Sequence, residues 1–266
     1  MKTLLKIIFR LFLFIILTII SQIGGIVFII SLILSKQWNK KIPFKTSIIF
    51  ISLYLCSTLF IVPHIAPLFG RERVQHSDKI KPTNYITVLL NRNYVLPELN
   101  TVLSQTASTL KKTPIEIHYL DANFPFINAF PLLPHLSHND GKKIDISLIY
   151  ETEDGKITNT QKSVSGYGSF ENPKPTEYNQ IDVCLKSGHF QYDYPKYLTL
   201  GTINKDLVFS KKGTRTLINS FLRNQSLGKL FIEPHLKSRM NLSNTKIRYH
   251  GCRAVRHDDH IHIQLK

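Results

Sequence analysis

The residues best suited to chemistry lie at the C-terminus of this 266-residue chain, where the stretch 257–262 has the sequence HDDHIH. From His260 to Leu265, polar and apolar residues alternate, which predicts a half-buried β-strand. Because residues two apart on a strand share a face, His260 and His262 should point to the same side. Two adjacent imidazoles can bind a metal ion, or one can bind it while the other transfers protons. A strand end with solvated histidines is the alternative, since short motifs also occur by chance.

A second cluster lies far upstream, in the stretch 135–147 with the sequence HLSHNDGKKIDIS. Its tripeptide 139–141, Asn-Asp-Gly, is typical of a turn, and the alternation that begins at Lys143 predicts a strand. A turn between His138 and Asp145 would let both side chains reach one point. Two histidines and one carboxylate leave zinc an open position for water, which is the arrangement of catalytic zinc sites.

Two aspartates, Asp258 and Asp259, precede the C-terminal strand. Carboxylates commonly orient metal-bound histidines from outside the coordination sphere, so these two could hold histidine tautomers. Either could equally be a surface charge. The sequence contains no His-Glu-x-x-His, no Gly-x-Ser-x-Gly and no P-loop, so the signatures of rival hydrolase classes are absent.

Together the two motifs resemble those of the penicillin-insensitive murein endopeptidases. These belong to a group of zinc proteins that includes lysostaphin-type enzymes, D-Ala-D-Ala peptidases and the hedgehog signalling domain. The family carries His-x-x-His-x6-Asp followed by a C-terminal His-Asp-Asp-His-x-His, and both patterns occur here, over residues 135–145 and 257–262. The resemblance covers roughly residues 84–266, and its specificity lies in the two motifs.

The resemblance implies Zn²⁺ as the cofactor. The metal ligands that it implies are His138, Asp145 and His262. It gives His260 the proton-handling role beside the metal, while His257 and His135 would line the site as supporting or substrate-side groups.

The function implied by the resemblance is a membrane-anchored zinc metallopeptidase that cleaves peptidoglycan stem peptides, as an endopeptidase at D-Ala cross-links. Two alternatives stay open: a D-Ala-D-Ala carboxypeptidase of the same zinc group, and a non-catalytic, zinc-containing wall-binding domain. We expect an α+β fold, with a mostly antiparallel sheet and flanking helices. Both motifs should lie on neighbouring strands of that sheet, because only then do the three ligands converge.

The N-terminal part is apolar enough to be a membrane anchor, which we assign to residues 1–68. About 20 apolar residues suffice to cross a bilayer. We expect one tilted span over residues 7–34 and a second over 47–62. A polar tether over 69–83 would then lead into the zinc-peptidase domain at 84–266.

The net charge of the whole chain is +16, and division after Lys81 gives the two parts charges of +9 and +7. Membrane-span flanks explain the first excess, and the second suits an anionic polymer such as a cell wall. No basic-aromatic motif indicates a nucleic-acid partner. Placing the lysine-rich loop 36–45 inside satisfies the positive-inside rule and puts the C-terminal domain outside. The resemblance then implies a bacterial cytoplasmic membrane, with the domain facing the periplasm or cell exterior.

Periodicity also predicts elements away from the two motifs. We expect a strand at 85–90, a helix at 97–110, a hairpin of strands 143–150 and 157–164, and a helix at 214–224. Of the three cysteines, Cys56 falls in an apolar segment. Cys184 and Cys252 could pair outside the cytosol, but three cysteines make no disulfide framework, and two buried thiols are the favoured interpretation.

Overall fold

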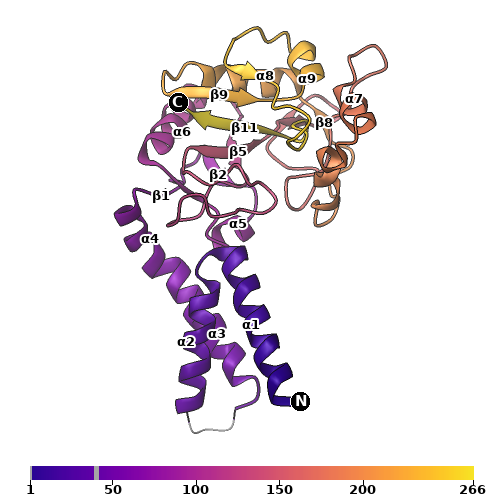
Figure 1. Ribbon diagram of the computed structural model, residues 1–266. Coiled ribbons are helices and arrows are strands. Elements are labelled where there is room, and N and C mark those ends of the chain that lie inside the picture. Colours follow the sequence, from indigo (N-terminus) through magenta and orange to yellow (C-terminus); the bar gives the residue numbers. More distant parts are fainter. Residues whose placement is uncertain (1, 39–41) are drawn as a thin grey trace. The chain divides into compact units, whose positions relative to one another are not determined.

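The structure is a computed structural model that describes residues 2–38 and 42–266 (Figure 1). Contacts between Cα atoms divide the chain into two compact units. The first comprises Met1–Val74, Ile86–Pro97 and Asn123–Gly141, and the second comprises Gln75–Tyr85, Glu98–Ala122 and Lys142–Lys266. Two stretches that follow residue 84, Ile86–Pro97 and Asn123–Gly141, therefore belong to the same unit as the N-terminal residues.

The first unit begins with apolar helices. They are α1 (Lys2–Ser21), α2 (Gly24–Gln37), α3 (Lys45–Cys56), the π-helix η1 (Ser57–Ile61), α4 (Val62–Ile65) and the 3-10 helix η2 (Ala66–Phe69). Within the described residues, Thr3–Ser21 and the continuous Lys45–Phe69 are long and apolar enough to cross a membrane. These two helices suggest a membrane anchor by their length and composition. Two lysines of the predicted basic loop, Lys40 and Lys41, lie outside the described residues.

The span expected over residues 7–34 is not one continuous helix. Gln22 has a left-handed backbone with φ of 66°, and the Ser21 hydroxyl accepts a hydrogen bond from the Gly24 amide at 3.1 Å. The chain therefore turns back, and α2 packs along α1 (Figure 1). A Cβ atom on Gly24 would lie 2.5 Å from the carbonyl oxygen of Leu17, so glycine is required for this close approach.

A buried arginine organises the stretch 123–141 of the first unit, which carries the upstream histidines. The Arg71 side chain is 1% exposed, and its guanidinium donates to the carbonyl oxygen of Phe124 and to the side-chain oxygen of Asn128. At the end of the same stretch, the Gly141 amide donates to the Asn123 side chain at 3.1 Å. These bonds fix both ends of a segment that has little regular structure.

The largest sheet lies in the second unit. Within the described residues it has six strands, in the order β10-β9-β11-β5-β4-β2. Their bounds are β2 Ile80–Pro82, β4 Ile117–Tyr119, β5 Lys143–Ser147, β9 Leu227–Phe231, β10 Ile247–Arg248 and β11 His260–Leu265. The three inner pairings are antiparallel and the two edge pairings are parallel. The α+β class is confirmed, and the sheet is mixed.

Two smaller sheets are antiparallel. One pairs β1 (Glu72–Arg73) with β3 (Tyr94–Val95), and the other has the order β7 (Ile157–Thr158), β6 (Tyr150–Glu151), β8 (Val208–Phe209). The expected hairpin forms between β6 and β7, with Gly155 at φ of 78° in its turn, but its strands are shorter than predicted. β1 and β2 both lie within residues 69–83, the stretch expected as a tether.

Helices account for most of the remaining regular structure. They are α5 (Tyr85–Leu89), α6 (Pro97–Leu110), α7 (Gln180–Lys186), the 3-10 helix η3 (Phe190–Tyr197), α8 (Lys211–Leu222) and α9 (Pro234–Arg239). The helix predicted over 97–110 is confirmed as α6. The strand predicted over 85–90 is wrong, because α5 occupies it; the strand preference of its β-branched residues is overridden by context. The Asn224 amide donates to the Thr106 hydroxyl at 3.0 Å, which ties the chain after α8 to α6.

The two cysteines of the second unit form a disulfide. Cys184 on α7 and Cys252 are bonded with an S–S distance of 2.06 Å, and Cys184 is fully buried. The interpretation of two free thiols is therefore wrong: a separation of 68 residues hides from the sequence that the chain returns to α7. Among the described residues, Cys56 is the free cysteine.

Candidate metal centre

Two neighbouring strands carry part of each motif: Asp145 lies on β5, and His260 and His262 lie on β11, whereas His135 and His138 precede β5. β11 pairs antiparallel with β5, and the register sets His262 opposite Asp145 and His260 opposite Ser147. The His262 Nδ1 atom lies 2.9 Å from Oδ1 of Asp145. Because β11 pairs with β9 on its other edge, it is a central strand, and it is buried on both faces rather than half-buried. The sheet ladder thus fixes the backbone of both residues.

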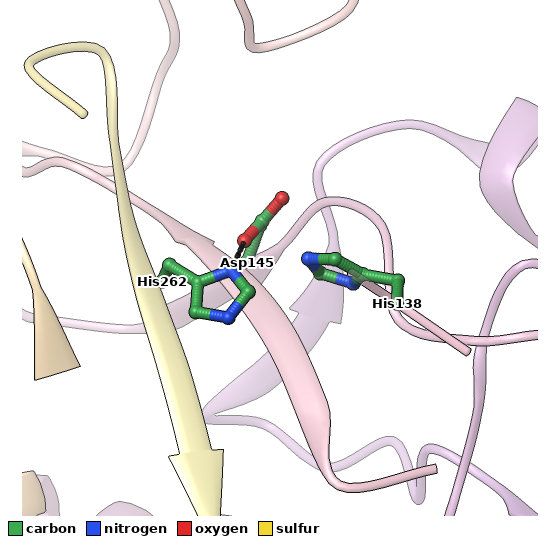
Figure 2. A group of neighbouring side chains, drawn as sticks. All are labelled: His138, Asp145 and His262. Atoms are coloured by element: carbon green, nitrogen blue, oxygen red, sulfur yellow. Dashed lines mark hydrogen bonds and ion pairs between the residues drawn. The ribbon is translucent and has the colours of Figure 1, made fainter. Parts of the chain in front are cut away.

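Three of the predicted residues form a compact group (Figure 2). One ligand atom from each of His138, Asp145 and His262 lies within 4.8 Å of the others, and all three side chains are buried. His138 follows a tight turn in which its amide donates to the carbonyl oxygen of His135 at 3.0 Å. Two imidazole nitrogens and one carboxylate oxygen form a donor set that zinc accepts, and other divalent transition metals bind similar sets. The group could therefore hold a metal ion.

A buried tyrosine holds the second oxygen of the carboxylate. The Tyr167 hydroxyl donates to Oδ2 of Asp145 at 2.8 Å and accepts from the Asp121 amide at 3.1 Å. Burial, then the charges of Asp121 and Asp145, raise the pKa of Tyr167 well above its usual value, so the phenol stays protonated. Asp145 therefore keeps a fixed orientation, as outer residues commonly provide for metal ligands.

His260 is held by Asp259. Its Nδ1 atom lies 2.5 Å from Oδ1 of Asp259, while Nε2 lies 3.7 Å from Oδ1 of Asp145. Oδ2 of Asp259 accepts from the Gly168 amide at 2.6 Å. Burial disfavours the charged imidazolium, but the carboxylates of Asp145 and Asp259 outweigh burial and raise the pKa of His260 to about 9. A divalent cation on Asp145 would oppose this increase.

The two aspartates of the motif do different work. Both are buried, so neither is a surface charge. Asp259 orients His260, whereas Asp258 accepts two hydrogen bonds from the Arg256 guanidinium, at 2.7 and 2.5 Å, and lies 3.6 Å from Nε2 of His235. Asp258 therefore holds the start of the motif against Arg256 and His235. Neither of these partners is a candidate metal ligand.

His257 and His135 also lie beside other histidines. The His257 ring centroid is 4.8 Å from that of His260 and 5.8 Å from that of His262. Burial, then the charges of neighbouring histidines, lower the pKa of His257 well below its usual value, so it is neutral. The ring centroid of His135 is 5.6 Å from that of His138.

Three further residues were not predicted. Tyr167 lies in a stretch with no periodic signal, and Glu233 follows a strand as an ordinary surface residue would. Glu233 is nevertheless buried, and its Oε1 accepts from the His257 amide at 3.0 Å and from the Tyr192 hydroxyl at 2.6 Å. The exposed His250 has its ring centroid 5.3 Å from that of His257. No local pattern marks these residues, because each reaches the cluster through tertiary structure.

Comparison with models of known protein families and with curated proteins gives no match to this chain. The geometry therefore carries the functional argument. It shows a buried group of two histidines and one aspartate that could hold a metal ion, with a further oriented histidine beside it.

Proposed function

We propose that the protein is a membrane-anchored zinc metallopeptidase that cleaves peptidoglycan stem peptides, as an endopeptidase at D-Ala cross-links. The observation that carries this proposal is the buried ligand group, with its donor atoms within 4.8 Å of one another. The pattern of both sequence motifs, which resembles that of murein endopeptidases, supplies the substrate class. No other described group of histidine, cysteine or carboxylate side chains offers a comparable metal site.

In this proposal, His138, Asp145 and His262 hold the zinc ion. Zinc, when bound, polarises a scissile carbonyl and makes water a stronger acid. Tyr167 keeps Asp145 oriented through the hydrogen bond to Oδ2. The small separation of the three donor atoms, their burial and their mixed nitrogen and oxygen character suit a three-residue catalytic site.

His260 transfers the proton. With its Nδ1–H donating to Asp259, the Nε2 atom on the other side of the ring would accept a proton from water and return it to the leaving amine, once a cation on Asp145 opposes the increase in pKa and leaves the imidazole neutral. The short bond to Asp259 fixes both the ring plane and the tautomer. His257 is neutral, and its ring centroid lies 4.8 Å from that of His260, so it packs against that imidazole.

We place the second unit outside the cytoplasm. The support is the Cys184–Cys252 disulfide together with two helices long enough to cross a membrane, because structural disulfides persist mainly in oxidising compartments. Reporter fusions made after Lys81 test the orientation. A reporter active only outside the cytoplasm should function there, and activity restricted to a cytoplasm-dependent reporter would overturn the placement.

The function is tested with the full-length protein in detergent and purified murein. We expect cross-linked fragments to fall to monomers, chelation to stop the reaction, and added zinc to restore it. Loss of terminal D-Ala without loss of cross-links would instead indicate a carboxypeptidase. Unchanged murein with zinc bound would indicate a binding domain. His118→Ala is a matched control, because His118 lies on β4 of the same sheet but bonds Glu116 at 3.0 Å instead.

A further inference from the structure

A row of polar side chains follows the outer face of α8. Lys211, Arg215, Asn219 and Arg223 are spaced four residues apart, so they lie one above the other on the same side of the helix. All four are exposed. From the first to the last, the row extends about 18 Å along the helix axis.

Two hollows flank this row. One, of about 540 Å³, is lined by Lys211, Lys212 and Arg215, and the other, of about 530 Å³, by Arg215, Arg223 and asparagines. Arg215 and Asn219 line both hollows, so the two adjoin along the helix. We call the two hollows and the row between them the α8 groove. The groove, with a row of about 18 Å, is longer than the binding site of a single small anion would need to be.

The cations of the groove have no anionic partners in the described part of the chain. The side chains of Lys211, Lys212, Arg215 and Arg223 form neither an ion pair nor a hydrogen bond there. Some cations elsewhere in the second unit are paired with carboxylates, as in Lys162–Glu171, Arg239–Glu177 and Arg256–Asp258. Among the described residues that line the hollows, Glu151 is the one carboxylate. The groove therefore has an excess of positive charge, with four cations against one carboxylate.

The start of α8 is tied to the segment that follows β5, the strand of the candidate ligand Asp145. The Ile149 amide donates to the Thr214 hydroxyl on α8 at 3.1 Å, and the Ser210 amide donates to the Ile149 carbonyl oxygen at 2.9 Å. Ile149 follows Asp145 by four residues, which even a fully extended chain limits to about 14 Å. The start of α8 is therefore joined through Ile149 to the chain segment that follows Asp145.

We propose that the α8 groove binds the polymer on which the protein acts, through carboxylates on its peptide stems. This inference rests on the proposed function. The groove's cations attract the carboxylates, and the amides of Asn219, Asn241 and Asn244 can bond the polar groups between them. Binding at the groove would hold the protein on its polymer without contributing to the chemical step.

Co-sedimentation of the full-length protein with insoluble murein tests the groove. The measurement uses His260→Ala as background, since that variant should keep its metal but cleave slowly. Adding the triple substitution Lys211→Gln, Arg215→Gln and Arg223→Gln should weaken binding about tenfold, which is the size expected for three exposed charge pairs. Binding should also weaken as salt is raised, because exposed charges are screened.

A control with the same loss of charge carries Lys156→Gln, Lys174→Gln and Lys205→Gln, all exposed and outside the groove. It should bind murein like the background protein. Equal losses in both triple variants, or no loss in the groove variant, would overturn the proposal. Groove-dependent binding to vesicles of anionic phospholipid, without binding to murein, would also overturn the proposal.

The test separates failure of the groove from failure of the proposed function. In the otherwise unmodified protein, the groove substitutions should slow cleavage of insoluble murein but leave cleavage of a soluble cross-linked dimer unchanged. Groove-dependent binding without any cleavage would refute the proposed peptidase activity but support the proposed binding of murein at the groove. Normal cleavage of insoluble murein by the groove variant would refute the proposed role of the groove but support the proposed peptidase activity.

Discussion

The two motifs are held by different means. His260 and His262 lie on β11, where backbone ladders to β5 and β9 fix them from both sides. His135 and His138 lie in a stretch without a strand ladder of its own, whose order depends on the buried Arg71. The candidate metal group thus combines residues fixed by a strand ladder with a residue, His138, whose segment is held by a few polar bonds.

Because the two motifs are held differently, a substitution on β11 should remove only a functional group, whereas a substitution at Arg71 should change the local structure around His138. A change of one side chain on β11 removes a functional group but leaves the ladder intact, because the ladder uses backbone atoms. A change at Arg71 removes no functional group, yet it releases the segment that carries His138. The substitutions below distinguish these two kinds of effect.

The largest effect should come from His262→Ala. This variant deletes a candidate ligand whose Nδ1 atom lies 2.9 Å from Asp145, so zinc and activity should be lost together. Zinc content by elemental analysis and murein cleavage are measured on the same preparation. Circular dichroism should show a retained fold, and zinc retained at the wild-type level would contradict the assignment.

His260→Ala should behave differently, although it changes the same strand face. Asp145 and the other two ligands remain, so zinc should be kept, while turnover should fall about 10²–10⁴-fold, as for removal of a general acid or base. Cleavage rates at saturating zinc make the comparison. Near-normal turnover would mean that His260 is only packed beside the metal group.

Glu233→Gln tests the buried support of His257. Burial, then the charge of Asp258, raise the pKa of Glu233 to about 7 from 4.5. Between these values the folded protein binds more protons than the unfolded chain, so stability falls as pH rises from 4.5 through 7. Relative to the glutamine variant, the wild type should lose about 3 kcal/mol across this window. Urea unfolding in detergent at several pH values checks it, and a difference independent of pH would contradict it.

Arg71→Met should have a smaller, indirect effect. It leaves the Phe124 carbonyl oxygen without its buried donor, at a cost of about 1–3 kcal/mol. We expect zinc affinity to fall about tenfold with the β11 residues unchanged. Arg73→Met is the matched control: Arg73 bonds Thr58 and Tyr94 in the same unit, so zinc affinity should hold. Equal losses in both variants would show a general loss of stability.

Local pattern was sufficient where the structure itself is local. The alternation at 260–265 and the helical spacing at 97–110 correspond to β11 and α6 at the predicted bounds. The neighbouring placement of β5 and β11 followed from requiring two motifs to converge. The pairing of Asp259 with His260 is also local, since the two residues adjoin in sequence.

Other features depend on contacts between distant residues. Tyr167 bonds Asp145 across 22 positions, and Glu233 bonds the His257 amide across 24, so neither produces a periodic signal. The turn between α1 and α2 depends on glycines that permit close packing, which hydropathy alone cannot distinguish from a tilted span. The disulfide likewise required knowledge of where the chain returns.

The central claim is that His138, Asp145 and His262 bind one zinc ion. It is tested most directly by the zinc content of the purified full-length protein and of its His138→Ala variant. The account predicts one zinc per chain in the wild type and little in the variant, because one of three ligands is gone. Full zinc retention by His138→Ala, or no zinc in a folded wild type supplied with it, would contradict the account.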